Sequence, residues 1–249
     1  MADKRVVLVI QARMGSTRLP GKSLMDLAGA PLVGRILERV KRCRRIDEIV
    51  LAIPDTASDA VLGDLGRQYG VRVFAGSEND LVERYYQAAL AHGAEIVGRL
   101  PADNATPEPA EIDRIADYHR GLGRRGFSSN LAQIWGNGYP DGIGAEMFDM
   151  SLLAEARERN SEPRQREHVH LNFFDYGTQK AADEQWCPVS TIPCPPEFAR
   201  PDLVLDVNTE AQYRFLRELY EALYPQNPQF HITDIIAWYD KVYRPAHPA

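Results

Sequence analysis

The sequence predicts an α/β protein built on a mainly parallel sheet with helices on both faces. Through roughly the first 120 residues, short apolar runs rich in Val, Ile and Leu alternate with longer amphipathic stretches. Such one-to-one alternation is typical of βαβ units, whose crossovers place helices on both faces of a parallel sheet. No apolar run approaches the ~20 residues of a membrane span, so we expect no membrane partner.

The strands and helices of this sheet can be assigned in order from the pattern. A fifth strand is expected much later than the first four, at residues 203–207. Pro31 suits a first helical turn and Ser58 suits an N-cap. The first four strands are expected at residues 6–10, 49–53, 71–74 and 96–100, and the helices at 31–41, 58–69, 80–92 and 109–119.

The regular pattern changes after the glycine-rich stretch at residues 121–126. Residues 127–201 carry short β-like pieces, many Gly and Pro, and one helical pair near 151–160 and 164–174. Its proline-rich end cannot be a central helix or strand. We expect a single domain over residues 1–249, with an irregular α+β insertion at about 127–201 that covers the site and contributes to a homodimer interface. Two final helices are expected near 209–223 and 233–243.

Composition excludes some classes of function. The formal net charge of −6 argues against a general nucleic-acid binder, which usually has a basic balance. The N-terminal residues run into the first strand without a secretory apolar region, so we expect a cytoplasmic protein. The three cysteines form no C-x-x-C motif, and His168 and His170 form a lone H-x-H, which is only a weak zinc signal.

The most informative motif follows the first expected strand at residues 11–22, with the sequence QARMGSTRLPGK. Its small residues allow backbone N–H groups to approach a ligand, and its cationic side chains can bond anionic oxygens. The spacing matches neither a P-loop nor G-x-G-x-x-G. We therefore expect a different kind of polyphosphate-binding loop, the alternative being a solvated basic turn.

Two further polar clusters follow expected strands, at Asp103 and at Asp206. In open parallel sheets, ligands bind outside the carboxyl ends of the strands. Mg²⁺ prefers one or two carboxylates together with phosphate oxygens and water, which these aspartates could supply. Helix capping is the alternative for both, most seriously for Asp206 just before Thr209 and a helical stretch.

The loop at residues 11–22 resembles the signature loop of the cytidylyltransferases grouped with spore-coat polysaccharide synthesis proteins. It resembles CMP-KDO and CMP-sialic acid synthetases more distantly. The resemblance implies a Rossmann-like, GT-A-like nucleotidyltransferase sheet and Mg²⁺ as cofactor. It also implies transfer of CMP from CTP to a small acidic acceptor, by default a 2-keto sugar acid and alternatively a phosphonate, with release of pyrophosphate.

Later segments resemble the same family, with departures. The family segment R-x-x-G-D-x-P is matched by Arg99 and Asp103 but has Ala102 in place of glycine, and residues 206–210, DVNTE, loosely resemble D-T-P-E-D. Residues 76–88 resemble a segment that implies Arg84 near the cytosine or ribose, with a capped helix and a solvated arginine equally open. Residues 139–148 resemble Y-P-D-G-x-D-x-E-x-F, with Gly144 where aspartate is usual, and residues 166–169 resemble R-E-H-V.

Together, the loop chemistry and the resemblance define an expected site. The expected catalytic residues are Arg13, Lys22 and Asp103; nucleotide-binding residues are Gln11, Ala12, Arg13, Met14, Gly15, Ser16, Lys22, Asp80, Arg84 and Arg99; acceptor-binding residues are Asp141, Glu146, Arg166 and His168; and metal ligands are Asp103 and Asp206.

Two alternatives remain open at this point. A glycosyltransferase of similar fold would use a nucleotide sugar, and such enzymes often carry a D-x-D motif, which is absent from the expected strand ends. A regulatory module that binds nucleotide without catalysis is kept open by the altered segment 101–105. Retention of Arg13, Lys22 and Asp103 together favours an active enzyme.

Overall fold

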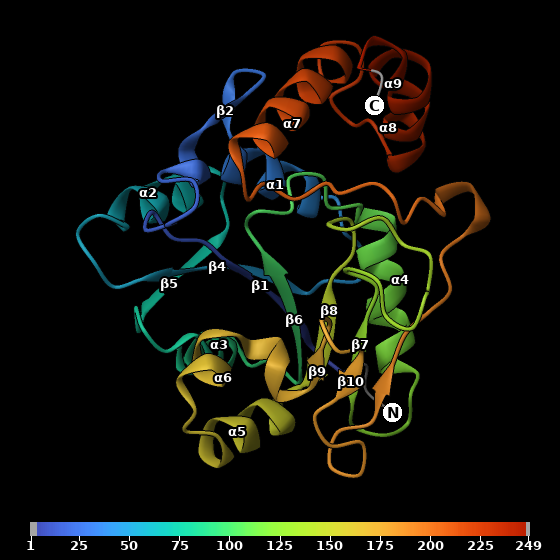
Figure 1. Ribbon diagram of the computed structural model, residues 1–249. Coiled ribbons are helices and arrows are strands. Elements are labelled where there is room, and N and C mark those ends of the chain that lie inside the picture. The colour runs from blue at the N-terminus through green and yellow to red at the C-terminus, as the bar shows by residue number, and fades with distance from the viewer. Residues whose placement is uncertain (1–3, 248–249) are drawn as a thin grey trace.

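The computed structural model describes residues 4–247 and has a seven-stranded mixed sheet at its centre (Figure 1). The strand order is β11-β7-β8-β6-β1-β4-β5, and β6, β1, β4 and β5 run parallel. These four strands are β1 (Val6–Gln11), β4 (Glu48–Pro54), β5 (Arg72–Gly76) and β6 (Ile96–Pro101). The α/β prediction and its first four strands are confirmed.

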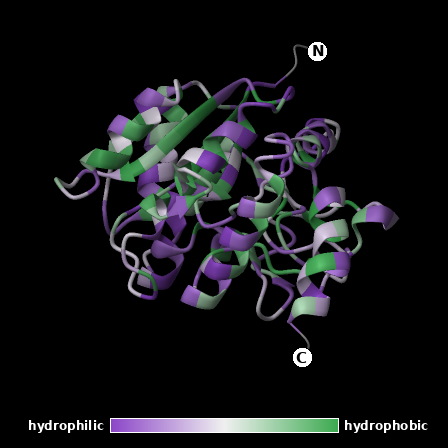
Figure 2. Cartoon of the chain, turned by 90° about the horizontal axis from the view of Figure 1, so that it is seen from above, coloured by the Kyte–Doolittle hydropathy of each residue, from purple (hydrophilic) through white to green (hydrophobic). Residues whose placement is uncertain are grey.

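Helices cover both faces of this sheet because its central strands are apolar on both sides. Leu8 and Ile10 of β1 belong to one core, whereas Val7 and Val9 belong to the other. Figure 2 shows apolar strands running between helices of mixed polarity. The first core includes residues of α1 (Leu32–Val40), α2 (Ala60–Gln68) and α4 (Pro109–Arg120), and the second includes residues of α3 (Leu81–Ala91) and α5 (Met150–Arg159).

Strands that follow β1 in the sequence are added first on one side of β1 and later on its other side. From β1 the chain passes through α1 to β4 on one side, and it later returns through α3 to β6 on the other side of β1. The loops that follow β1 and β6 therefore meet at a topological switch point, where open α/β sheets bind their ligands.

The insertion is more regular than the sequence suggested. It adds β7 (Phe127–Ser129), β8 (Glu146–Asp149) and β11 (Val189–Ser190) to the main sheet, and β8 runs antiparallel to β6. Strands of two to four residues are too short to show alternation among Gly and Pro. The helix expected at 164–174 is instead α6 (Pro163–Glu167) followed by the 3₁₀ turn η2 (Val169–Asn172), because His168 has extended dihedral angles. A small hairpin follows, formed by β9 (Phe174–Asp175) and β10 (Lys180–Ala181).

The strand predicted at residues 203–207 is wrong. This segment forms only isolated bridges, pairing Asn104 with Asp206 and Asp141 with Val204, because its neighbours are loops rather than a strand of the sheet. It leads into α7 (Glu210–Leu223), which begins at a capping box formed by Thr209 and Gln212. The remaining elements are η1 (Lys22–Leu24), β2 (Asp26–Leu27), β3 (Ala30–Pro31), η3 (Pro196–Phe198), α8 (Ile232–Trp238), η4 (Tyr239–Tyr243) and α9 (Arg244–Ala246).

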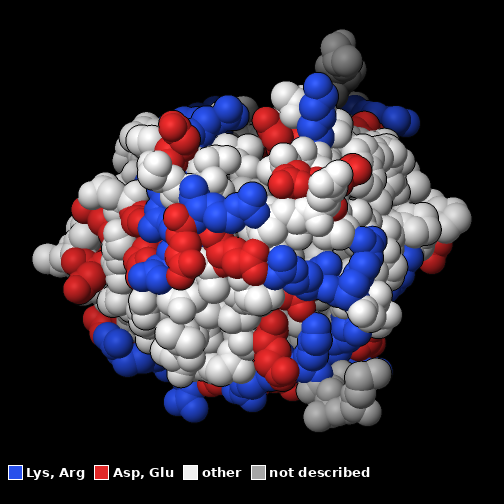
Figure 3. All heavy atoms as spheres, turned by 90° about the horizontal axis from the view of Figure 1, so that it is seen from below, with Lys and Arg blue, Asp and Glu red and all other residues white. Residues whose placement is uncertain are grey.

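The described part of the chain contains no helix with the length and apolar character needed to cross a bilayer. On the face shown in Figure 3, Lys and Arg side chains lie interspersed with Asp and Glu side chains.

Candidate active site

A cavity of about 410 Å³ lies at the carboxyl ends of β1 and β6. Its wall combines the 11–22 loop, the segment after β6, parts of the insertion and Asp206. The wall includes these predicted residues: Gln11, Ala12, Arg13, Ser16, Lys22, Arg84, Arg99, Asp103, Asp141, Glu146, His168 and Asp206. The sheet therefore gathers most of the expected site around one space.

The 11–22 loop is held in shape by contacts that sequence reasoning missed. The buried Asp59 carboxylate accepts a hydrogen bond from the Met14 backbone N–H at 2.7 Å and another from Thr56 Oγ1 at 2.6 Å. Ser23 Oγ donates to the Arg13 carbonyl at 3.0 Å. Asp59, and not the expected Ser58, stands at the N-cap of α2, but its carboxylate makes no capping bond there. No pattern in the sequence indicates this distant partner.

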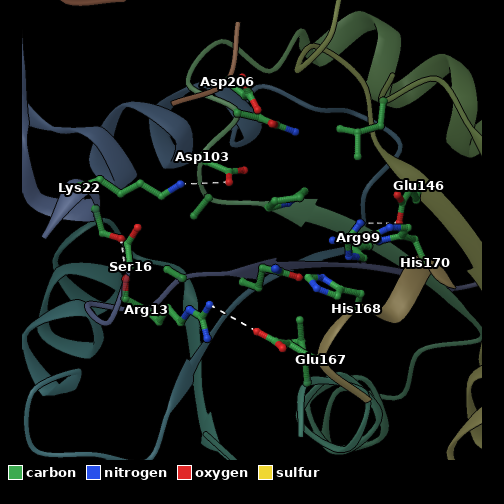
Figure 4. A pocket seen from close by; sticks show the side chains of 18 of the residues that line it. Arg13, Ser16, Lys22, Arg99, Asp103, Glu146, Glu167, His168, His170 and Asp206 are labelled. Atoms are coloured by element: carbon green, nitrogen blue, oxygen red, sulfur yellow. Dashed lines mark hydrogen bonds and ion pairs between the residues drawn. The ribbon is translucent and has the colours of Figure 1, made fainter. Parts of the chain in front are cut away.

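Lys22 joins the loop to the two segments that carry the predicted metal ligands (Figure 4). Its Nζ lies 3.1 Å from Asp103 Oδ2, 2.6 Å from the Val207 carbonyl oxygen and 3.3 Å from Asn208 Oδ1. An ammonium group has three donor hydrogens, so these acceptors satisfy it fully. In this arrangement Lys22 has to leave at least one acceptor before it can contact a ligand.

Three carboxylates lie close enough to affect one another in this part of the cavity. Backbone pairing of residues 104 and 206 brings Asp206 beside Asp103. Burial, with the charge of Asp103 as a further cause, raises the pKa of Asp206. Burial together with the charges of Asp206 and Asp103 raises the pKa of Asp141 to about 6. The carboxylates repel one another, so an added cation would relieve electrostatic stress.

The donor set at this end fits Mg²⁺. No three His, Cys, Asp or Glu side chains within residues 4–247 form a group that could hold a metal ion by themselves. Mg²⁺, however, is usually bound by one or two carboxylates and completes its octahedron with phosphate oxygens and water. Asp103 and Asp206 provide hard oxygen ligands from two different segments beside an open cavity, which satisfies that requirement.

The opposite end of the cavity is built on a buried ion pair (Figure 4). Arg99 Nη1 donates to Glu146 Oε2 at 2.8 Å, and the two residues face each other across β6 and β8. Tyr176 Oη donates to the other oxygen of Glu146 at 2.9 Å. The Arg99 Nε has no hydrogen-bond partner among the described residues. This end of the cavity therefore presents a guanidinium that is fixed by a buried counter-charge.

His168 and His170 complete the wall beside Arg99. Burial, reinforced by Arg99 and His168, lowers the pKa of His170 to about 2, and burial also lowers the pKa of His168. Nδ1 of His170 has no partner in the described part of the chain. Tyr176 and His170 were not assigned to the site from sequence, and only the H-x-H pattern gave a signal for the latter.

Arg84 is buried and lines the cavity, so the alternative of a solvated arginine is wrong. Its Nη1 donates to the Ser77 carbonyl at 3.0 Å, while its Nε is unpaired within residues 4–247. Burial, with the nearby charge of Arg13 as a further cause, lowers the pKa of Arg84.

Four predicted residues do not line this cavity: Met14, Gly15, Asp80 and Arg166. Asp80 caps α3 by accepting from the Glu83 N–H at 2.9 Å, and Arg166 Nε donates to its other carboxylate oxygen at 2.8 Å. These two residues, expected to bind different substrates, bind each other and tie α6 to α3. Their expected substrate roles stay predictions.

Two departures from the family pattern have structural explanations. A side chain at Gly144 would place Cβ 2.1 Å from the Asn130 carbonyl oxygen, so aspartate does not fit without a backbone shift. Non-glycine residues with positive φ in the described chain are confined to Ala28, Trp135 and Gln179. Ala102 therefore needs no glycine-like conformation to replace the glycine.

Comparisons with known proteins agree with this geometry. Spore coat polysaccharide biosynthesis protein SpsF of Bacillus subtilis is 28% identical over 221 residues, covering 87% of this chain and 86% of that protein. A cytidylyltransferase structure from Leptospira borgpetersenii serovar Hardjo-bovis has a TM-score of 0.85 at 27% identity and covers 98% of this chain and 96% of that one. A CMP:2-keto-3-deoxy-manno-octonic acid synthetase complexed with CTP shares the fold, with a TM-score of 0.62 at 16% identity over 87% of this chain and 98% of that one.

The family of this chain is shown by a match over most of its length. Residues 7–176 match the family described as Cytidylyltransferase, and this range includes all of β1 except its first residue, together with β6, the 11–22 loop and the Arg99–Glu146 pair. The match spans more than half of the sequence. The chain belongs to the cytidylyltransferase family.

Proposed function

We propose that this protein transfers CMP from CTP to an oxygen of a small acidic acceptor and releases pyrophosphate. The observation that carries the proposal is the meeting of a cationic loop and two carboxylates at the ends of β1 and β6. In the proposed reaction the acceptor oxygen attacks the α-phosphorus of CTP, and the bond to the pyrophosphate oxygen breaks.

The nucleotide would occupy the end of the cavity formed by the 11–22 loop. Arg13, Arg18 and Lys22 line the cavity there, and all three can bond phosphate oxygens. Arg84 lines the same cavity and would contact the ribose or the base. Nucleotidyl transfer depends chiefly on positioning and on stabilising the charge that develops on the leaving group.

Mg²⁺ would be held by Asp103 and Asp206. When bound, it would neutralise charge on the phosphates and the departing pyrophosphate. The protein's own part is to keep the two carboxylates adjacent, which the bonds from Val207 N to the Asp103 carbonyl (2.8 Å) and from Ala105 N to the Leu205 carbonyl (3.3 Å) achieve. Lys22 would then transfer from Asp103 to the phosphates.

The acceptor would lie against Arg99, His168, His170 and Tyr176. The guanidinium of Arg99 suits an anionic group, and a neutral His170 can exchange hydrogen bonds with sugar hydroxyls. SpsF and the octonic acid synthetase are named for polysaccharide biosynthesis and for a sugar acid. A 2-keto sugar acid is therefore the first acceptor to test, with a phosphonate second.

Pyrophosphate release from each of the four NTPs, with Mg²⁺ and a panel of sugar acids and phosphonates, tests this proposal. We expect release to require both CTP and an acidic acceptor, with a neutral sugar of the same size as the matched control. CTP should be preferred over UTP by roughly 5- to 150-fold, because a site that pairs the exocyclic amine of cytosine leaves its acceptor unpaired with uracil, at a cost of about 1–3 kcal/mol.

Other outcomes identify the alternatives. Equal release from CTP and UTP would contradict the proposed base recognition. Sugar transfer from a nucleotide sugar would support a glycosyltransferase, and tight CTP binding without any pyrophosphate release would support a regulatory module.

The proposed active form is a homodimer. The insertion carries an exposed Trp135 that is 49% accessible in the single chain, next to the hairpin that contributes Tyr176 to the cavity. Light scattering should give a mass near twice the 28.0 kDa of one chain. A mass of one chain across micromolar concentrations would contradict this expectation.

A further inference from the structure

Asn208 lies between the cations of the 11–22 loop and the predicted metal ligand Asp206. Its Oδ1 accepts from Arg18 Nη2 at 2.7 Å and from Lys22 Nζ at 3.3 Å. Its Nδ2 donates to Asp206 Oδ2. The same amide thus contacts both halves of the proposed nucleotide and metal site.

The polarity of these contacts requires an amide. Two cationic donors meet the carbonyl oxygen, while a carboxylate meets the NH₂ group, so reversing the amide would place donors against donors. Aspartate would lose the bond donated to Asp206 and add repulsion, and alanine would lose both contacts. Proline, which stands third in the D-T-P-E-D pattern that residues 206–210 loosely resemble, would also lose the backbone N–H that donates to Gln212 Oε1 at 2.9 Å.

A second amide fixes the other oxygen of the same carboxylate. Gln212 Nε2 donates to Asp206 Oδ1 at 2.9 Å, and Gln212 is itself held by the capping box of α7. Asp206 is therefore oriented by one amide on each oxygen. Each carboxylate oxygen keeps a further lone pair, so the orientation leaves room for a metal–oxygen bond.

We propose that Asn208 is a positioning residue that orients Asp206 for a divalent cation and, in the nucleotide-free protein, holds Lys22 and Arg18 beside it. The inference rests on the metal role proposed above for Asp206. Mutation of a residue that orients a metal-ligating carboxylate typically lowers metal affinity by 10- to 100-fold. Because Asn208 also competes with a triphosphate for Lys22 and Arg18, its removal should leave nucleotide affinity without metal equal or higher.

The experiment measures two affinities of the full chain, wild type and Asn208→Ala. Mn²⁺ binding is followed from the paramagnetic resonance signal of free Mn²⁺ without nucleotide, and CTP binding is followed by calorimetry in EDTA. We expect Asn208→Ala to weaken Mn²⁺ binding about tenfold or more, with no weakening of CTP binding. Asn227→Ala is the matched control, since Asn227 accepts one backbone bond in the turn after α7, outside the cavity wall.

Each result decides between roles for Asn208. Unchanged Mn²⁺ affinity would overturn the inference, and so would equal weakening of Mn²⁺ and CTP binding, which indicates a general structural defect. If the alanine variant shows no cooperative melting, Asn208→Ser replaces it, because serine keeps one small donor and acceptor, and we expect a smaller loss of Mn²⁺ affinity.

Asp206→Asn separates this inference from the proposed function. Unchanged Mn²⁺ binding in Asp206→Asn, or none in wild type, would reject the metal role of Asp206 and the inference with it. Loss in Asp206→Asn but not in Asn208→Ala would reject the inference alone.

Discussion

The two ends of the cavity hold opposite charges together in different ways. At the loop end, the Lys22 and Asp103 side chains are 12% and 25% exposed and lie 3.1 Å apart. At the opposite end, where β8 of the insertion borders the cavity (the insertion end), the Arg99 and Glu146 side chains are 6% and 0% exposed and lie 2.8 Å apart. Water can replace the partners in the first pair far more easily than in the second.

This difference separates a part that can rearrange from a part that cannot. Lys22 bonds three oxygens on segments outside regular strands, so breaking one of these bonds leaves the backbone hydrogen bonds of the sheet intact. Arg99 and Glu146 are directly paired residues of β6 and β8, and separating them would leave a buried charge uncompensated. We expect chemistry to depend mainly on the loop end and stability mainly on the insertion end.

The largest expected effect is on catalysis at the loop end. Asp103→Asn nearly preserves side-chain volume but removes a formal charge from the proposed metal site. CTP-dependent pyrophosphate release should fall by about 10²- to 10³-fold, since the ion stabilises developing charge. The melting temperature of the nucleotide-free protein should stay close to wild type.

Asp64→Asn, at an exposed ion pair on α2, is the control for Asp103→Asn and should change neither quantity. A near-normal rate in Asp103→Asn would make the metal assignment untenable, because asparagine serves almost as well as aspartate in a cap or turn.

The next effect is on stability at the insertion end. Glu146→Gln keeps the size of the side chain but leaves the buried Arg99 without its counter-charge. The free energy of unfolding, measured in urea, should fall by about 3–5 kcal/mol. Glu155→Gln breaks the exposed pair with Arg125 and should cost less than about 1 kcal/mol. Equal losses in the two variants would show that burial does not distinguish these pairs.

A smaller effect concerns the pH dependence of stability. With its pKa lowered to about 2, His170 stays neutral in the folded protein below pH 6.5, whereas the unfolded chain takes up a proton there. The contribution of His170 to the free energy of unfolding is therefore fully present above about pH 6.5. It decreases as the pH falls, by about 2 kcal/mol at pH 5.

His170→Asn should flatten the change in unfolding free energy between pH 7 and pH 5, measured by urea titration at each pH. Comparing slopes removes any packing loss that is independent of pH. An unchanged slope in His170→Asn would mean that this imidazole is accessible to protons in the folded state.

The sequence predicted the loop end better than the insertion end. The four parallel strands are apolar runs between amphipathic helices, so their positions along the chain followed from the pattern. So did the places of the 11–22 loop and Asp103 after strand ends. β7, β8 and β11 have only two to four residues each, too few to show a period. The pairing of Arg99 with Glu146 therefore could not be derived from spacing.

Contacts between distant polar residues were also beyond sequence reasoning. Asp59 reaches the Met14 N–H across 45 residues, and Asp80 binds Arg166 across 86. Such bonds depend on how packed elements bring side chains together, which local propensity does not encode. The resemblance supplied residue roles, but it gave no indication that Asn208 and Gln212 would hold Asp206.

The cross-strand register of β6 and β8 has a consequence for changing the acceptor. Because Glu146 stands opposite Arg99 within the sheet, we expect substitutions in this part of the cavity wall to be poorly tolerated. His168, His170 and Tyr176 line the same cavity but come from the short segment between α6 and β10. That segment belongs to no strand of the main sheet. Because these residues line the proposed acceptor end of the cavity, grafting residues 168–176 from a relative should change which acceptor is used and leave the proposed transfer from CTP in place.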